Sequence, residues 1–197
     1  MIRIGLTGSI AMGKSEAARY FASQGLPVFD ADAEVHKLYD SPEGAALLQP
    51  YAPEATKEGR VDRKILTSLI MADKDLLKKL EGVVHAEIRT RRAAFIEKAK
   101  AHHPAVILDI PLLFETGGEK DVDVSLVISS RPELQRERAL ARPGMTPERL
   151  DMILGRQLAD SEKRRRATYV IDNNSTVQEL QKRLGEFLRT LGLKSDA

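Results

Sequence analysis

Eight consecutive residues near the start of the chain have the types and spacing that hold phosphate. Residues 8–15 are Gly-Ser-Ile-Ala-Met-Gly-Lys-Ser, a full match to the pattern G-x-x-x-x-G-K-S/T. Glycines let such a loop turn consecutive backbone N–H groups inward, and a helix that begins there adds the partial positive charge of its N-terminus. Lys14 is a compact charge for the β- and γ-phosphates, and the Ser15 hydroxyl is a ligand for Mg²⁺. The loop is therefore predicted to bind the phosphates of a nucleotide.

Carboxylates follow two other strand-like segments. Asp109 ends the apolar run 105–109, a pattern typical of a strand that holds Mg²⁺ directly or through water. Asp30 ends the run 27–30, and Asp32 lies two residues beyond it. A carboxylate near a γ-phosphate can accept the proton of an attacking hydroxyl, so Asp32 is a candidate general base. Capping of the next helix is an equally good interpretation of Asp32, and one residue can do both.

Positive charge is concentrated in one segment. Residues 131–166 hold ten basic and six acidic side chains, whereas the whole chain has a net charge of +2. Arg138 and Arg142 are four residues apart, which predicts one helix face from which two guanidinium groups clamp phosphate oxygens. The basic run 163–166, taken alone, is better explained as a solvated helix surface.

Composition limits the class of protein. A chain of 197 residues predicts one substantial domain, and its balanced charge argues against a protein that coats nucleic acid. The absence of cysteine excludes disulfides, thiolate metal sites and cysteine nucleophiles. Apolar stretches are too short to span a membrane, and no signal-like segment opens the chain. We therefore expect a cytoplasmic protein with no membrane or nucleic-acid partner.

Strand-like and helix-like segments alternate along the chain. Helical spacing between the strand-like runs predicts an α/β fold with a parallel sheet. Hydroxyl side chains at Ser130, Thr146 and Thr176 predict helices that begin near 131, 147 and 177. The five predicted strands are 2–7, 27–30, 105–109, 124–129 and 169–172.

The long segment after the second strand predicts an inserted helical subdomain over about 32–103. Its first part is expected to be irregular because it contains Pro42, Pro50 and Pro53. The core is then 1–31, 104–130 and 167–197, with 131–166 as a separate helical segment. The last residues, 194–197, are expected to fray.

Four blocks of sequence resemble the dephospho-CoA kinase family, in the family's order and spacing over nearly the whole chain. They are Gly-Leu-Thr-Gly-Ser-Ile-Ala-Met-Gly-Lys-Ser at 5–15, Asp-Ala-Asp at 30–32, Asp-Ile-Pro-Leu-Leu-Phe-Glu at 109–115 and Tyr-Val-Ile-Asp-Asn at 169–173. The resemblance implies a P-loop, nucleotide-kinase-like fold: a five-stranded parallel sheet flanked by helices, with a helical CoA-binding insertion and a mobile helical lid over about 131–166.

The resemblance also implies an activity and its site. The activity is transfer of the ATP γ-phosphoryl group to the ribose 3′-hydroxyl of dephospho-CoA, with ATP and Mg²⁺ required and a monomer expected. Implied catalytic residues are Lys14, Asp32, Arg138 and Arg142, with Ser15 and Asp109 as metal ligands. Implied nucleotide contacts are Gly8, Ser9, Ile10, Ala11, Met12, Gly13, Lys14, Ser15, Glu16 and Asn173, and implied substrate contacts are Asp32, His85, Leu112 and Phe114.

The chain departs from the family pattern at two places. Ala11-Met12 stands where the family usually has Gly-Ser, so we expect residue 11 to adopt a backbone conformation open to alanine, without a positive φ. His85 precedes Ala86, where the family tends to have proline. His85 lines the CoA site by resemblance, but its position beside an apolar helical stripe favours packing.

Two other functions share the phosphate loop. A GTPase-like switch requires N-K-x-D and D-x-x-G after the third strand, and neither is present because Asp109 is followed by Ile-Pro-Leu and Asn173 by Asn174. A kinase of the same architecture that acts on a nucleoside monophosphate or another small alcohol remains the alternative.

Overall fold

The computed structural model describes residues 1–193, and the segment 194–197, for which fraying is expected, lies outside the described residues. The chain divides into two compact units. The first consists of Met1–Phe29 and Lys98–Ala197, and the second of Asp30–Glu97. The predicted lid segment, 131–166, lies within the first unit.

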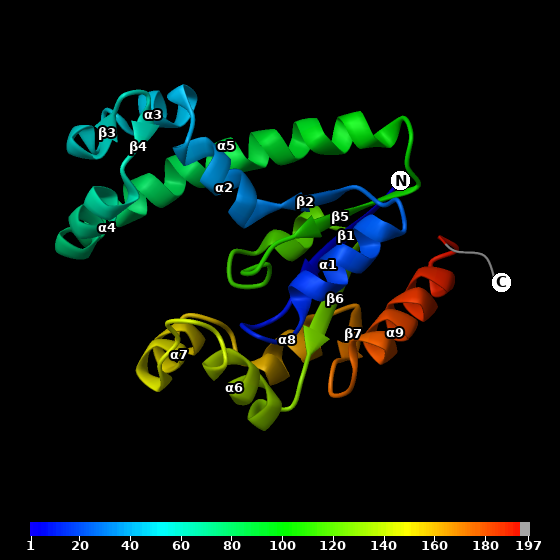
Figure 1. Cartoon of the computed structure of the whole chain (residues 1–197). Helices are drawn as coiled ribbons and strands as arrows, with labels where there is room; N and C mark the ends of the chain where they lie inside the picture. Colours follow the sequence, from blue (N-terminus) through cyan, green and yellow to red (C-terminus); the bar gives the residue numbers. More distant parts are fainter. Residues whose placement is uncertain (194–197) are drawn as a thin grey trace. The chain divides into compact units, whose positions relative to one another are not determined.

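A five-stranded parallel sheet organises the first unit (Figure 1). Its strand order is β2-β5-β1-β6-β7, and parallel pairing joins β1 to β5 and β6, and β6 to β7. Four of the predicted strands have the predicted bounds. The strand predicted at 27–30 begins one residue later, at Val28, and excludes Pro27, whose ring carries no N–H. The strands are β1 (Ile2–Thr7), β2 (Val28–Asp30), β5 (Ala105–Asp109), β6 (Val124–Ser129) and β7 (Tyr169–Asp172).

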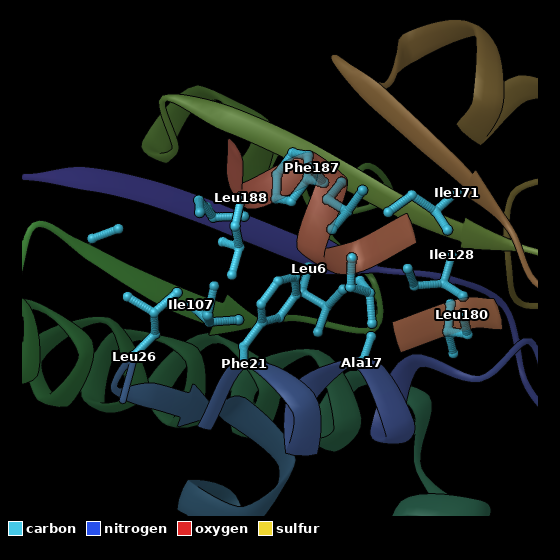
Figure 2. Close-up of a cluster of buried hydrophobic side chains, with 14 residues drawn as sticks. Leu6, Ala17, Phe21, Leu26, Ile107, Ile128, Ile171, Leu180, Phe187 and Leu188 are labelled. Atoms are coloured by element: carbon cyan, nitrogen blue, oxygen red, sulfur yellow. The ribbon is translucent and has the colours of Figure 1, made fainter. Parts of the chain in front are cut away.

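The main apolar core lies between the sheet and two helices, α1 (Lys14–Ser23) and α9 (Val177–Thr190). Figure 2 shows Phe21 of α1 and Phe187 of α9 close to Leu6 and Ile107 of the strands. The two phenylalanine rings meet edge to face, with centroids 6.1 Å apart. A smaller cluster around Leu113, Phe114 and Val127 is also buried. Strand β6 contributes Leu126 and Ile128 to the first cluster and Val127 to the second, so it carries apolar residues on both faces.

Three further helices follow β6. They are α6 (Pro132–Leu140), α7 (Pro147–Leu154) and α8 (Asp160–Arg166), and a 3-10 turn, η2 (Gly118–Asp121), precedes β6. The helix starts predicted near 131, 147 and 177 are confirmed, and Thr146 and Thr176 cap α7 and α9. The predicted cap at Ser130 is wrong. Asn174 Oδ1 accepts hydrogen bonds from Ser130 Oγ, at 3.2 Å, and from Arg131 N, at 2.7 Å, so a distant amide engages the hydroxyl.

The second unit is mainly helical and has its own apolar cluster, which includes Leu38, Leu48 and Leu80. Pro42 begins a helix instead of an irregular segment, because proline is tolerated at a first helical position. A short antiparallel hairpin, β3 with β4, was not predicted. The elements are α2 (Ala31–Tyr39), α3 (Pro42–Leu48), η1 (Pro53–Ala55), β3 (Thr56–Lys57), β4 (Arg60–Val61), α4 (Arg63–Ala72) and α5 (Lys74–Lys100), which continues into the first unit.

Membrane-spanning helices were sought along residues 1–193. None of the helices there has both the length and the apolar character needed to cross a bilayer.

Candidate phosphate-binding site

The phosphate loop connects β1 to α1. Gly13 is the N-cap residue of α1, with a left-handed backbone at φ 103°, and no side chain within residues 1–193 caps this helix. The first N–H groups of a helix have no partner inside the helix, and an anion is a suitable partner for them. The start of α1 therefore has the geometry of an anion site.

Two glycines allow neighbouring strands to pack against the loop. A Cβ atom on Gly8 would lie 2.5 Å from the carbonyl oxygen of Ile128, at the end of β6. A Cβ on Gly13 would lie 2.1 Å from Asn173 Nδ2. The same amide nitrogen donates a hydrogen bond to the carbonyl oxygen of Met12, at 3.0 Å. The ends of β6 and β7 thus fix the shape of the loop, and glycine is needed at both positions.

Ala11 has a positive φ of 62°, so the expectation of an ordinary backbone at this position is wrong. For a residue with a Cβ, the left-handed conformation costs about 1–2 kcal/mol relative to the right-handed one. Packing holds the alanine there, since it is 7% exposed and belongs to an apolar cluster with Ala139 of α6 and Leu150 of α7. The tertiary environment therefore overrides the local preference.

Charged groups meet beside the loop. The Lys14 ammonium group forms an ion pair with the carboxylate of Asp109, which is 3% exposed. The strand register pairs Asp109 with Leu6, so β5 delivers the carboxylate next to the end of β1. Ser15 is exposed at the start of α1. The structure thereby brings the Lys14 ammonium group and the Asp109 carboxylate together, and the Ser15 hydroxyl follows Lys14 directly in the chain.

The end of β7 links the loop to α6. Arg138 of α6 donates a hydrogen bond from Nη1 to the carbonyl oxygen of Asn173, at 2.9 Å. The preceding residue, Asp172, accepts a hydrogen bond from Arg164 at 2.5 Å, and this bond raises the pKa of the Arg164 guanidinium. Asn173, predicted to lie near the nucleotide, is thus held through its side-chain amide by Met12 and through its carbonyl oxygen by Arg138.

The arginine pair differs from its predicted arrangement. Helix α6 ends at Leu140, so Arg142 lies in the turn that follows, and the prediction that both side chains share one helix face is wrong. Arg142 is exposed, whereas Arg138 is partly buried against Asn173. The early end follows from the downstream Pro143-Gly144, where proline disfavours helix at the residue before it and Gly144 has φ 72°.

Two of the predicted site residues belong to the second unit. Asp30 is the N-cap of α2 and accepts a hydrogen bond from Ala33 N at 2.9 Å. Asp30 therefore caps this helix, and the interpretation of Asp32 as the cap is wrong, since Asp32 lies in the first turn and is exposed. His85 is also exposed on α5, so the interpretation of His85 as a packing residue is wrong. Its apolar neighbour Val84 is the residue that packs.

The remaining predicted contacts have different surroundings. Leu112 is 38% exposed, whereas Phe114 is 3% exposed and has the Arg166 guanidinium 5.0 Å above its ring. The Glu16 side chain accepts a hydrogen bond from Gln181 at 3.2 Å, so the start of α1 is tied to α9.

Several polar contacts of the loop were not predicted. Gln135 and Gln157 both hydrogen-bond to the backbone of Ile10, and Glu115 forms an ion pair with the fully buried Lys163. The prediction of a solvated surface for the basic run 163–166 is therefore wrong at Lys163, although residues 164–166 are exposed. Isolated glutamines in a polar segment give no pattern that could have identified them. Glu115 ends the Asp-Ile-Pro-Leu-Leu-Phe-Glu block, so the resemblance was the one clue to its importance.

Comparison with known proteins places these features in context. A family model for dephospho-CoA kinase matches residues 2–179. The dephospho-CoA kinase of Rhodopseudomonas palustris (strain HaA2) is 46% identical over 189 residues, which cover 95% of this chain and 94% of that protein. A crystal structure of a Thermus thermophilus protein aligns with a TM-score of 0.82 and 37% identity, over 96% of this chain and 97% of that one. Dephospho-CoA kinase from Campylobacter jejuni aligns with a TM-score of 0.73 and 26% identity, over 96% of both chains.

Proposed function

This chain belongs to the dephospho-CoA kinase family, and we propose that it transfers the γ-phosphoryl group of ATP to the ribose 3′-hydroxyl of dephospho-CoA, giving CoA and ADP. The observation that carries this proposal is the phosphate loop beside the Lys14–Asp109 ion pair, in a chain that matches the family over nearly its full length. The alternative acceptors, a nucleoside monophosphate or another small alcohol, would use the same loop.

Charge neutralisation and positioning are the main tasks of such a site, because phosphoryl transfer requires little covalent chemistry from the protein. The free amides at the start of α1 and the Lys14 ammonium group bind the phosphates in this proposal. Lys14 belongs to the phosphate loop and pairs with Asp109, so it can neutralise the carboxylate and the phosphates together.

The residues beside the loop fit a magnesium ion. Mg²⁺ prefers oxygen ligands and is usually held by one or two protein groups together with substrate phosphates. The exposed Ser15 hydroxyl and the buried Asp109 carboxylate supply such oxygens. When bound, the ion neutralises charge that develops on the phosphate oxygens.

Asp32 is the proposed general base. Its carboxylate accepts the proton of the 3′-hydroxyl while that oxygen forms a bond to the γ-phosphorus and the bond from phosphorus to the β,γ-bridging oxygen breaks. ADP leaves with the bridging oxygen. The support in the structure is local: Asp30 caps α2, which leaves the exposed Asp32 carboxylate available.

The basic segment 131–166 supplies two further groups in this proposal. Arg138 and Arg142 neutralise charge on the transferred phosphoryl group, and lid closure excludes water. Exchange of Arg142 for alanine is expected to lower turnover, because its guanidinium is exposed and can reach a ligand. Unchanged turnover would show that Arg142 does not neutralise charge on the transferred phosphoryl group.

Contacts to dephospho-CoA are proposed for His85 and Leu112, both of which are exposed. Phe114 is buried and would act by supporting the segment that carries Leu112. Magnesium dependence, a monomeric state and a cytoplasmic location remain predictions.

An ADP-release assay with a panel of acceptors tests the proposed function. The panel contains dephospho-CoA, nucleoside monophosphates and simple alcohols, each with Mg²⁺ and ATP, and the Lys14→Ala variant serves as the blank. Strong stimulation by dephospho-CoA, with 3′-phosphorylated product identified by mass spectrometry, is the expected result. Stimulation by nucleoside monophosphates alone would contradict the proposal and favour the alternative.

A further inference from the structure

Two glutamine side chains hold the backbone of one residue in the phosphate loop. The N–H group of Ile10 donates a hydrogen bond to Gln157 Oε1, at 3.2 Å. The carbonyl oxygen of the same residue accepts a hydrogen bond from Gln135 Nε2, at 2.9 Å. Gln135 lies in α6 and is 8% exposed, and Gln157 follows α7. Both backbone groups of Ile10 are therefore satisfied by side chains more than a hundred residues away.

Apolar contacts reinforce these bonds. Ala11, which has a positive φ, packs against Ala139 and Leu150, and Ile10 lies at the edge of the same cluster. The contacted residues come from α6, the helix that carries Gln135, and from α7, the helix that precedes Gln157. The loop is thus held by α6, α7 and the segment after α7 through both polar and apolar contacts.

A buried ion pair positions Gln157. The N–H group of the next residue, Leu158, donates a hydrogen bond to Glu115 Oε1, at 2.8 Å. The same carboxylate oxygen lies 2.9 Å from Lys163 Nζ, and the Lys163 side chain is fully buried. Removal of one partner from a buried pair leaves an uncompensated charge, so Glu115 and Lys163 constrain each other strongly. The constraint reaches Gln157 through the backbone of Leu158.

We propose that Gln135 and Gln157 are positioning residues for nucleotide binding, with Glu115 fixing the second of them. By holding Ile10, they keep the phosphate loop in one conformation, so that less ordering entropy is lost when phosphate binds. The proposal rests on the proposed function only in that the loop binds a triphosphate. It does not depend on which alcohol accepts the phosphoryl group.

Calorimetry with MgADP and MgATP provides the first test. Gln135→Ala and Gln157→Ala are each expected to weaken nucleotide binding about fivefold, the size of one net hydrogen bond. KM for ATP should rise by a similar factor while kcat changes little, because the bonds are made equally before and during the reaction. The matched control is Gln178→Ala, at an exposed position of α9, which should bind nucleotide like the parent protein.

Hydrogen exchange at the Ile10 amide provides a second test, in protein without added nucleotide. Loss of the Gln157 acceptor in Gln157→Ala should speed exchange at this amide. Gln157→Glu retains an oxygen that can accept this hydrogen bond, so it should restore slow exchange. Gln135→Glu has no donor for the Ile10 carbonyl and should not restore the contact made by Gln135. These isosteric variants also cover the case in which an alanine variant folds poorly.

Three results would overturn the proposal. Faster Ile10 exchange with unchanged nucleotide affinity would make the glutamines structural only. Tighter nucleotide binding in Gln157→Ala would mean that Gln157 competes with phosphate for the amide. Unchanged exchange and unchanged affinity would mean that the contacts have no role. Failure of the proposed function is distinguishable, because it would appear as absent phosphorylation of dephospho-CoA by the parent protein.

Discussion

The helices after β1 and β2 begin in opposite ways. Between β1 and α1 lies the loop 8–13, and the N-cap, Gly13, has no side chain to offer. Between β2 and α2 there is no loop, and the Asp30 carboxylate accepts the hydrogen bond of Ala33 N. Both helices start with unpaired amides, as every helix does. No side chain among residues 1–193 caps the first helix, so a ligand can bind its amides, whereas the second satisfies an amide with its own chain.

The difference shows how one structural element serves two purposes. A helix N-terminus becomes an anion site when no side chain of the protein caps it and the preceding loop brings further N–H groups to it. A capped N-terminus is instead a source of stability and a fixed support for the side chains of its first turn. Lys14 and Asp32 lie in the first turns of these two helices, and they are the residues to which we assign phosphate binding and proton transfer.

The largest predicted effect is at the uncapped helix. Lys14→Ala should lower turnover about a thousandfold, because a positioned charge at the transferred group is lost. Steady-state ADP release measures the effect. The matched control is Lys182→Ala, at an exposed position of α9, which should leave the rate unchanged. A Lys14 variant with near-normal turnover would contradict the assignment of residues 8–15 as the loop that binds the phosphates of ATP.

The second effect separates the two carboxylates of the capped helix. Asp32→Asn should lower kcat about a hundredfold or more through loss of a general base, while calorimetric affinity for MgATP stays nearly the same. Asp30→Asn should keep both the cap and the rate, since asparagine is as good a cap as aspartate. If the two variants behaved in the reverse way, Asp30 and not Asp32 would be the base.

The third effect concerns Gly13, the N-cap residue of α1, which has no side chain to cap the helix. Gly13→Ala should destabilise the protein by about 3 kcal/mol, since it adds a left-handed backbone penalty to a collision with Asn173. Gly117→Ala also has a positive φ but meets nothing within 4 Å, so it should cost only about 1 kcal/mol. Urea unfolding of both variants measures the difference. Equal losses would show that Asn173 does not constrain the loop.

The smallest effect is loss of the cap itself. Asp30→Ala should lower the free energy of unfolding by about 1 kcal/mol, because the amide of Ala33 loses its acceptor. Urea unfolding compared with Asp30→Asn isolates the hydrogen bond from other effects. A loss shared equally by both variants would mean that the carboxylate charge matters and the cap does not.

Much of the fold could be predicted because its signals are local. The five strands are short apolar runs bounded by turns, and the proline and threonine at 146–147 mark a helix start within three residues. Two of the wrong predictions concern residues whose conformation or hydrogen bond is set by a group far away in the sequence. Ser130 gives its hydroxyl to Asn174, and Ala11 keeps a positive φ because α6 and α7 pack on it. Neither partner is adjacent in the sequence, so spacing alone could not identify them.

Residues 8–15 determined, without any other part of the chain, that a phosphate loop follows the first strand, because glycines, a lysine and a serine at that spacing have few other uses. Tertiary structure decided what surrounds the loop. It set Asp109 against Lys14, Asn173 against Gly13, and two glutamines on Ile10. Such pairings join residues that are remote in the chain, and only the packing of strands and helices determines which side chains meet.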